Sequence, residues 1–247
     1  MSVEFLTLAD CRLAYQRQVT DKSKPGIIFL GGYASDMQGT KAVFLSERCA
    51  EHSISFTRFD YRGCGQSPGS FTDGTIGAWL EDSLAVFDRL TQGMQIIIGS
   101  SMGGWLGLLL AKARPERVKA LIGVAAAPDF TEDLVWEKLT TIQRETLLRE
   151  GEIYEDGAPP DHRVPMTLKL IEEARQHLVL RAPLPIACPV RLLQGMKDVE
   201  VPWSYAQRIA AHVDQEDVRV TLIKNGDHRL SIPEDLGLLW QMVAEFV

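Results

Sequence analysis

Short apolar runs alternate along the chain with longer segments in which apolar residues recur at helical spacing. The run GIIFL at residues 26–30 is continuously apolar, which is typical of a strand buried on both faces of a parallel sheet. The pattern predicts strands over residues 3–8, 12–19, 26–30, 53–60, 94–99, 118–126, 190–195 and 218–224. It predicts helices over residues 40–52, 76–90, 102–114, 203–212 and 234–247. This alternation favours an α/β fold with a mostly parallel, eight-stranded sheet flanked by helices.

The alternation of strands and helices is interrupted after Pro128. Residues 129–185 are rich in charge, and helical periodicity occurs over residues 133–149 and 167–178. Between these two predicted helices, residues 151–165 contain three prolines and are expected to form a loop. This stretch does not continue the strand-helix repeat, so it is interpreted as a helical insertion.

We therefore predict a helical cap at residues 129–185, inserted into a core made of residues 1–128 and 186–247. The apolar residues of the cap are expected either to line an acyl pocket or to pack against the core beneath. These residues are Leu134, Val135, Trp136, Leu139, Ile142, Met166, Leu168 and Ile171.

Composition is that of an ordinary globular protein. Of the 247 residues, 45% are hydrophobic and 24% are charged, values that exclude a disordered or collagen-like chain. The 33 acidic and 26 basic residues give a formal net charge of −7, so we expect no nucleic-acid partner. These values leave the oligomeric state open.

Cysteine spacing and the N-terminal residues bear on location. The four cysteines lie far apart without a C-x-x-C pair, which favours reduced thiols. Residues 1–18 lack the basic and apolar regions of a signal peptide and are too acidic for a transit peptide. The longest apolar run, residues 105–111, is far shorter than the roughly 20 residues that span a bilayer. These features predict a cytoplasmic protein without integral membrane association.

Residues 99–103 have the pattern G-x-S-x-G, with Ser101 at its centre. The pattern directly follows a predicted strand and opens a predicted helix, as a nucleophile elbow requires. Small flanking residues are needed there because strand and helix approach each other closely. Ser101 is therefore the candidate nucleophile. Ser100 is the alternative, and a serine in a plain glycine-rich turn is the other interpretation.

A serine nucleophile needs a general base. Among the five histidines, only His228 follows the last predicted strand and precedes the last predicted helix. We interpret His52, His162, His177 and His212, which lie in helices or in the charged insertion, as surface residues. His228 is the candidate base.

The base in turn needs a carboxylate that orients it. Asp198 lies in the loop after a predicted strand, which places it at the same sheet edge as the candidate nucleophile and base. Glu200, Asp227 and Asp129 are alternatives, since each also lies near a strand end. Asp198 is preferred because its loop comes directly after the strand predicted at residues 190–195, and Asp129 is the leading alternative.

Acyl transfer also needs hydrogen-bond donors for the oxyanion that develops during the reaction. One expected donor is the backbone amide of Met102, the residue after the candidate nucleophile. The other is the amide of Tyr33, which follows two glycines in the loop after the strand predicted at residues 26–30. The alternative is an ordinary glycine turn with a packing tyrosine.

Several segments carry a resemblance to a known family. FDYRGCGQS at residues 59–67 resembles the D-x-R-G-x-G-x-S segment of the α/β-hydrolases. Four further segments resemble the branch of that family that contains mitochondrial acyl-glucuronide esterases and palmitoyl-protein thioesterases, with their bacterial relatives: GGYASDMQGTKA, GSSMGGWLGLLLAKARPERV, CPVRLLQGMKDVEVPW and GDHRL. The resemblance extends from about residue 25 to about residue 240 and is weakest in the insertion.

The resemblance implies an α/β-hydrolase fold and a serine hydrolase. It assigns the nucleophile to Ser101, the acid to Asp198, the base to His228 and the oxyanion amides to Tyr33 and Met102. It implies a small-molecule carboxylic ester or acyl thioester as substrate, and no metal or organic cofactor. Thioesterase activity on S-acyl proteins or acyl-CoA is an alternative main role. A cofactor-free peroxidase or lyase, or a binding module without turnover, is also compatible with the fold.

Overall fold

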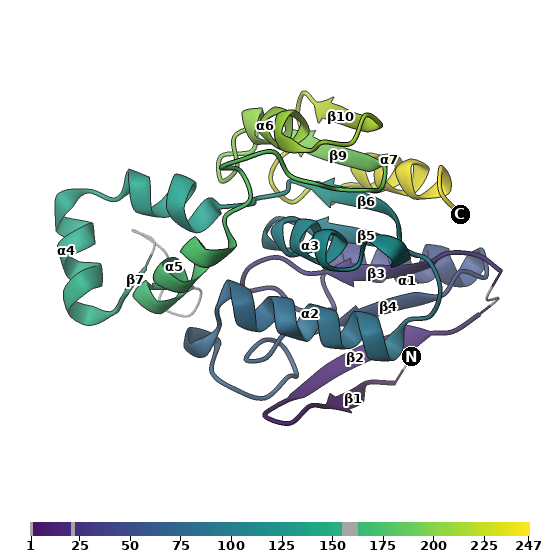
Figure 1. Ribbon diagram of the computed structural model, residues 1–247, viewed down its shortest axis with the longest axis horizontal. Coiled ribbons are helices and arrows are strands. Elements are labelled where there is room, and N and C mark those ends of the chain that lie inside the picture. Colours follow the sequence, from purple (N-terminus) through teal and green to yellow (C-terminus); the bar gives the residue numbers. More distant parts are fainter. Residues whose placement is uncertain (1, 21–22, 155–162) are drawn as a thin grey trace.

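Figure 1 shows the computed structural model, which describes residues 2–20, 23–154 and 163–247. The strands of the main sheet are β1 (Glu4–Thr7), β2 (Arg12–Gln18), β3 (Gly26–Leu30), β4 (Phe56–Phe59), β5 (Gln95–Ser100), β6 (Val118–Val124), β9 (Val190–Gly195) and β10 (Val218–Ile223). Their order is β1-β2-β4-β3-β5-β6-β9-β10. The pairs β1–β2 and β2–β4 are antiparallel, and the other pairs are parallel. The predicted mostly parallel, eight-stranded sheet is confirmed.

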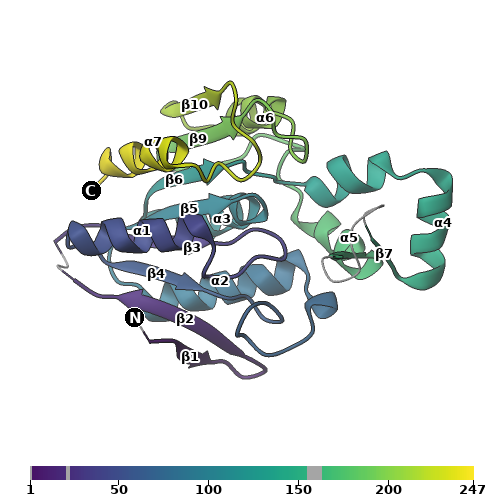
Figure 2. The same ribbon diagram turned by 180° about the vertical axis from the view of Figure 1, so that it is seen from behind.

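Helices cover both faces of this sheet (Figures 1 and 2). One face carries α1 (Thr40–Glu51) and α7 (Pro233–Ala244), and the other carries α2 (Ile76–Leu90), α3 (Met102–Ala113) and α6 (Ser204–His212). In β3, Ile27 and Phe29 pack under α1 and α7, whereas Ile28 and Leu30 pack under α2 and α3. Burial on both faces explains why this strand is apolar at every position. Among the described residues, no helix combines the length and apolarity needed to cross a membrane.

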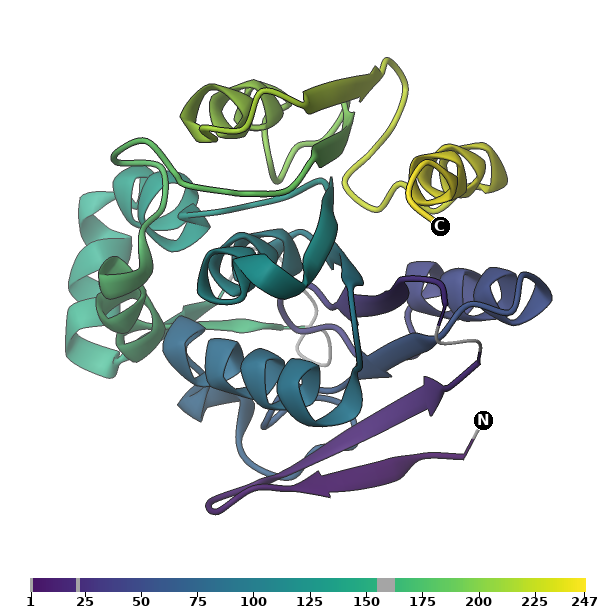
Figure 3. The ribbon, with the colours of Figure 1, turned by 45° about the vertical axis from the view of Figure 1, so that its right-hand side comes forward.

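We call residues 129–185 the β6–β9 segment. This segment lies beyond the edge of the sheet at which β6 ends (Figures 1 and 3). Its described elements are a π-helix (Thr131–Val135), a 3₁₀ turn (Trp136–Lys138), α4 (Thr141–Glu150), β7 (Glu152–Tyr154), β8 (Pro165–Thr167), α5 (Leu168–Ala174) and a second 3₁₀ turn (Arg175–His177). The segment therefore holds short helices together with a small two-stranded sheet.

Two predicted elements of the β6–β9 segment differ from the structure. The helix expected over residues 133–149 is broken, because Thr140 accepts a hydrogen bond from the Gln143 amide and begins a new helix with a capping box. The loop expected over residues 151–165 contains strand pairing at its ends, where Tyr154 lies opposite Pro165. Residues 155–162, which include His162, lie outside the described residues.

Candidate active site

Ser101 lies at the turn between β5 and α3, in a backbone conformation that residues other than glycine rarely adopt. Its φ is +53° and its ψ is −119°. The Ser101 amide donates to the Val124 carbonyl at 2.9 Å, and the Ser101 carbonyl accepts from the amides of Gly104 and Ala127 at 2.8 and 3.0 Å. These backbone bonds hold the strained turn, which raises the hydroxyl above the sheet edge as in a nucleophile elbow.

The glycines on either side of Ser101 are needed for close approach. A Cβ atom on Gly99 would lie 2.2 Å from the Gly103 carbonyl oxygen. A Cβ atom on Gly103 would lie 2.1 Å from the Leu30 carbonyl oxygen. Both contacts are with backbone, which cannot move aside without shifting a strand or a helix. The predicted requirement for small residues around Ser101 is confirmed.

Gly103→Ala is expected to destabilise the protein by about 3 kcal/mol, because the added methyl group overlaps the backbone of β3. Gly237→Ala is the matched control, since Gly237 lies in α7 and a Cβ atom there would meet open space. That change is expected to stabilise the helix by up to about 1 kcal/mol. Urea unfolding measures both values. Equal stabilities for the two variants would contradict this account of the turn.

The structure brings Ser101, His228 and Asp198 together from three strand ends. Nε2 of His228 lies 3.1 Å from Oγ of Ser101, and Nδ1 of His228 lies 2.7 Å from Oδ2 of Asp198. Ser101 follows β5, Asp198 follows β9, and His228 follows β10. The three side chains therefore form a continuous chain of hydrogen-bond contacts. The geometry is that of a nucleophile, a base and an orienting acid.

The Asp198 carboxylate is completely buried and held from several sides. Its Oδ1 accepts the amides of Glu200 and Val201 at 2.9 and 2.8 Å, and its Oδ2 accepts Nε2 of Gln194 at 2.9 Å. These bonds fix the carboxylate toward His228. Sequence reasoning missed Gln194, although a fully buried glutamine in a strand such as β9 is a signal that it has a polar partner nearby.

Three of the alternative residues, Ser100, Asp227 and Glu200, differ in position from Ser101 and Asp198. Ser100 pairs with Val124 in the sheet, whereas His228 contacts Ser101. Oδ1 of Asp227 accepts the Leu230 amide at 2.9 Å and so caps a turn. Oε2 of Glu200 lies 3.5 Å from Nε2 of His228, but the Glu200 side chain is 66% exposed, whereas the Asp198 carboxylate is buried.

The fourth alternative, Asp129, makes its contacts within the β6–β9 segment. It is fully buried, has a positive φ of 59°, and accepts the amides of Val179 and Leu180 at 2.8 and 2.9 Å. Nη1 of Arg181 lies 3.2 Å from Oδ2 of Asp129, the oxygen that also accepts the Leu180 amide. Burial raises the pKa of Asp129, while the two amides and the arginine act in the opposite direction. Asp129 thereby joins the beginning and the end of the β6–β9 segment.

The other described histidines have their own contacts. His52 stacks on Trp240 with ring centroids 5.1 Å apart. Nε2 of His177 lies 2.7 Å from Glu173, and Nδ1 of His212 lies 2.8 Å from the Arg208 carbonyl. These contacts place the three histidines away from Ser101.

The loop after β3 lies directly beside Ser101. A Cβ atom on Gly32 would be 3.4 Å from Cβ of Ser101, so this loop reaches the turn at Ser101. Met102 is the first residue of α3, where a backbone amide has no acceptor within the helix. The positions of Met102 and of Tyr33, the residue after Gly32, are compatible with two amides facing one oxyanion.

A cavity of about 1200 Å³ opens at Ser101 and His228. Tyr33 lines it from the core, and seven apolar residues line it from the β6–β9 segment: Phe130, Leu134, Val135, Leu139, Ile153, Val164 and Met166. Other residues expected there lie elsewhere. The Trp136 ring contacts the guanidinium groups of Arg144 and Arg175, Ile142 is 77% exposed, and Ile171 is fully buried.

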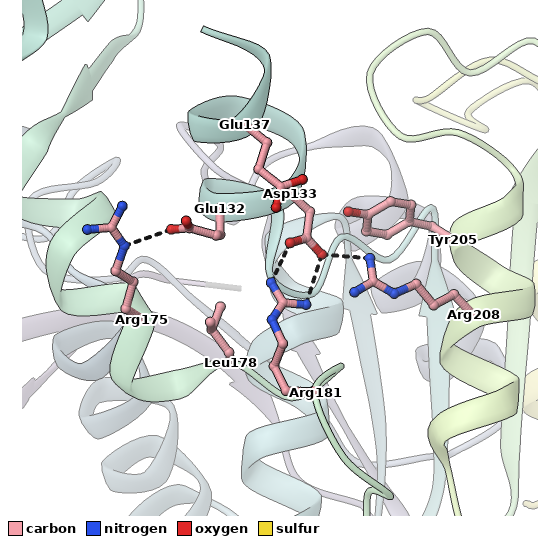
Figure 4. A pocket seen from close by; sticks show the side chains of 8 residues that line it. All are labelled: Glu132, Asp133, Glu137, Arg175, Leu178, Arg181, Tyr205 and Arg208. Atoms are coloured by element: carbon pink, nitrogen blue, oxygen red, sulfur yellow. Dashed lines mark hydrogen bonds and ion pairs between the residues drawn. The ribbon is translucent and has the colours of Figure 1, made fainter. Parts of the chain in front are cut away.

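A second pocket lies between the β6–β9 segment and α6, and ion pairs join most of the charged side chains that line it (Figure 4). Asp133 contacts both Arg181 and Arg208, and Arg175 contacts Glu132 at 2.7 Å. Burial alone would raise the pKa of Asp133, but the hydrogen bonds from the two arginines lower it below its ordinary value. This network fastens the base of the β6–β9 segment to the core.

Comparison with known proteins identifies the class. Residues 27–165 match the family model described as alpha/beta hydrolase fold, and the chain belongs to the α/β-hydrolase family. It is 39% identical over 247 residues to the palmitoyl-protein thioesterase ABHD10, mitochondrial, of Homo sapiens, covering 100% of this chain and 80% of that protein. The structure of alpha/beta hydrolase domain-containing protein 10 from mouse is also similar, with a TM-score of 0.91, 39% identity and coverage of 99% and 98%. A solved structure from Agrobacterium vitis S4 has a TM-score of 0.94 at 35% identity, with 100% of each chain covered.

The predicted cytoplasmic location is wrong by this comparison. The relatives from Bos taurus, Mus musculus and Homo sapiens are all named as mitochondrial proteins. The prediction failed because charge and hydropathy in residues 1–18 test for a leader only within those residues.

Proposed function

We propose that this α/β hydrolase cleaves carboxylic esters or acyl thioesters, with Ser101 as nucleophile, His228 as general base and Asp198 as the acid that orients it. The observation that carries this proposal is the continuous contact from Asp198 through His228 to Ser101 on a strained turn. The same arrangement performs acyl transfer on several unrelated folds.

In the first half of the reaction, Oγ of Ser101 attacks the carbonyl carbon while Nε2 of His228 takes the hydroxyl proton. The carbonyl oxygen becomes an oxyanion, which the amides of Tyr33 and Met102 stabilise. The bond to the leaving group then breaks, and His228 passes its proton to the departing alcohol or thiol. An acyl group remains on Ser101.

In the second half, His228 removes a proton from water, and the resulting nucleophile attacks the acyl carbon. The oxyanion forms again and collapses, so that a carboxylic acid leaves and Ser101 regains its proton from His228. Asp198 holds the imidazole in the tautomer that both halves need. No metal or organic cofactor enters this sequence of steps.

We also propose that residues 129–185 act as a cap on a core of residues 1–128 and 186–247. Support comes from Asp129, which joins the two ends of this segment, and from its apolar residues in the cavity. An acyl chain would lie against those residues with its carbonyl at Ser101. The names of the mammalian relatives favour a palmitoyl thioester among the substrates.

The test is hydrolysis of p-nitrophenyl esters and acyl thioesters from acetyl to palmitoyl, together with covalent labelling by a fluorophosphonate. We expect hydrolysis in at least one of the two substrate series and an adduct on the peptide that contains Ser101. Tandem mass spectrometry locates the adduct and separates Ser101 from Ser100. An adduct on Ser100, or no adduct on an active enzyme, would contradict the assignment of the nucleophile.

A further inference from the structure

Tyr33 connects two parts of the site that are far apart in sequence. Its backbone belongs to the loop proposed to supply an oxyanion amide. Its ring packs against Phe71, Trp79 and Phe130, with centroids 4.9, 5.9 and 5.8 Å away. Its hydroxyl donates a hydrogen bond to the carbonyl of Pro165 in β8. One residue thus joins the oxyanion loop to the β6–β9 segment.

The two ends of this connection differ in how firmly they are held. Three aromatic side chains pack against the Tyr33 ring, and the hydroxyl bond to Pro165 adds a directional contact to this packing. Burial raises the pKa of Tyr33, and the hydroxyl therefore remains a hydrogen-bond donor. On the other side, β7 and β8 have only three residues each and pair with each other outside the main sheet. A two-stranded pair of this size is marginally stable without further contacts.

The β7–β8 pair also forms part of the cavity wall. Ile153 of β7 and Met166 of β8 line the cavity, as does Val164 just before β8. Met166 is the residue next to Pro165, whose carbonyl accepts the Tyr33 hydroxyl. An acyl chain in the cavity would pack against these side chains and hold the pair in the position that binds Tyr33.

We propose that Tyr33 is a positioning residue whose hydroxyl couples the β7–β8 pair to the oxyanion loop, so that an acyl chain in the cavity raises kcat. This inference rests on the proposed function. The binding energy of the chain, which is remote from the reacting carbonyl, is used to fix the Tyr33 amide in the transition state. Acyl-chain length then affects turnover as well as binding.

Tyr33→Phe removes the hydroxyl and keeps the ring. For the native protein, kcat should be higher with the octanoyl than with the acetyl p-nitrophenyl ester. In the variant, kcat for the octanoyl ester should fall about tenfold, the size expected for one lost hydrogen bond. For the acetyl ester, kcat should fall several-fold less than for the octanoyl ester, because a short chain does not reach the β7–β8 pair. Tyr15→Phe is the matched control, since that hydroxyl binds Glu4 at 3.1 Å in the β1–β2 hairpin.

Met166→Ala provides a second line of evidence, because it removes a chain contact on β8 and leaves the Tyr33 hydroxyl in place. If the two residues act through one connection, the double variant should lose no more octanoyl kcat than the more impaired single variant. Equal losses for both esters in Tyr33→Phe, an unchanged kcat ratio, or fully additive losses would overturn the inference. Absence of Ser101-dependent hydrolysis in the native protein would instead overturn the proposed function.

Discussion

Ser101→Ala is expected to lower kcat for every ester and thioester substrate by at least about 10⁴-fold. Alanine keeps the Cβ atom and removes only Oγ, which lies 3.1 Å from Nε2 of His228. Without this oxygen no acyl-enzyme can form, and only the smaller rate enhancement from the oxyanion amides and the cavity remains. Steady-state hydrolysis and fluorophosphonate labelling measure the loss.

The matched control for this change is Ser100→Ala, one residue earlier. Ser100 is buried at the end of β5, and its replacement is expected to leave kcat within about threefold of the native value. Circular dichroism and thermal unfolding show whether both variants retain the fold. Substantial hydrolysis by a folded Ser101→Ala variant would remove the acyl-enzyme mechanism.

Asp198→Asn and Asp129→Asn form a pair that separates the proposed acid from its buried alternative. Asp198→Asn is expected to lower kcat by about 10⁴-fold, because an amide group facing Nδ1 of His228 favours the wrong imidazole tautomer. Asp129→Asn should keep kcat within about threefold and lower the free energy of unfolding by about 2 kcal/mol. It weakens the bonds to Val179 and Leu180 and the ion pair with Arg181.

The two Asp→Asn variants need both kinetic and unfolding measurements. The expected result is a large kinetic loss with a small stability change for Asp198→Asn, and the opposite for Asp129→Asn. The reverse pattern would make Asp129 the orienting acid. Such a result would require His228 to leave its 2.7 Å contact with Asp198.

Periodicity and local motifs were sufficient to predict the sheet, because its central strands β3, β4, β5, β6 and β9 are buried on both faces. The run GIIFL and the glycines around Ser101 carry their structural reasons within a few residues of sequence. The proximity of Ser101, Asp198 and His228 also follows from position, since the parallel strands that precede them end at one edge of the sheet.

Features that depend on contacts between distant residues could not be predicted in this way. The break before α4 depends on the cap at Thr140, which competes with a continuous helical pattern. The hydrogen bond from Tyr33 to Pro165 joins residues 132 positions apart. Gln194 and Asp129 acquire their roles only when folding brings Asp198 and Leu180 beside them.

The hydrogen bonds that Asp129 accepts from Val179 and Leu180 make the β6–β9 segment a separable module of the fold. Its beginning and its end meet at one buried carboxylate. The distance that the segment must span between β6 and β9 is therefore short, whatever the length of the chain in between. Insertions, deletions and exchanges within the segment can therefore alter the cavity while β6 and β9 remain paired. Substrate preference can diverge among relatives, or be redesigned by transplanting this segment, on an unchanged catalytic framework.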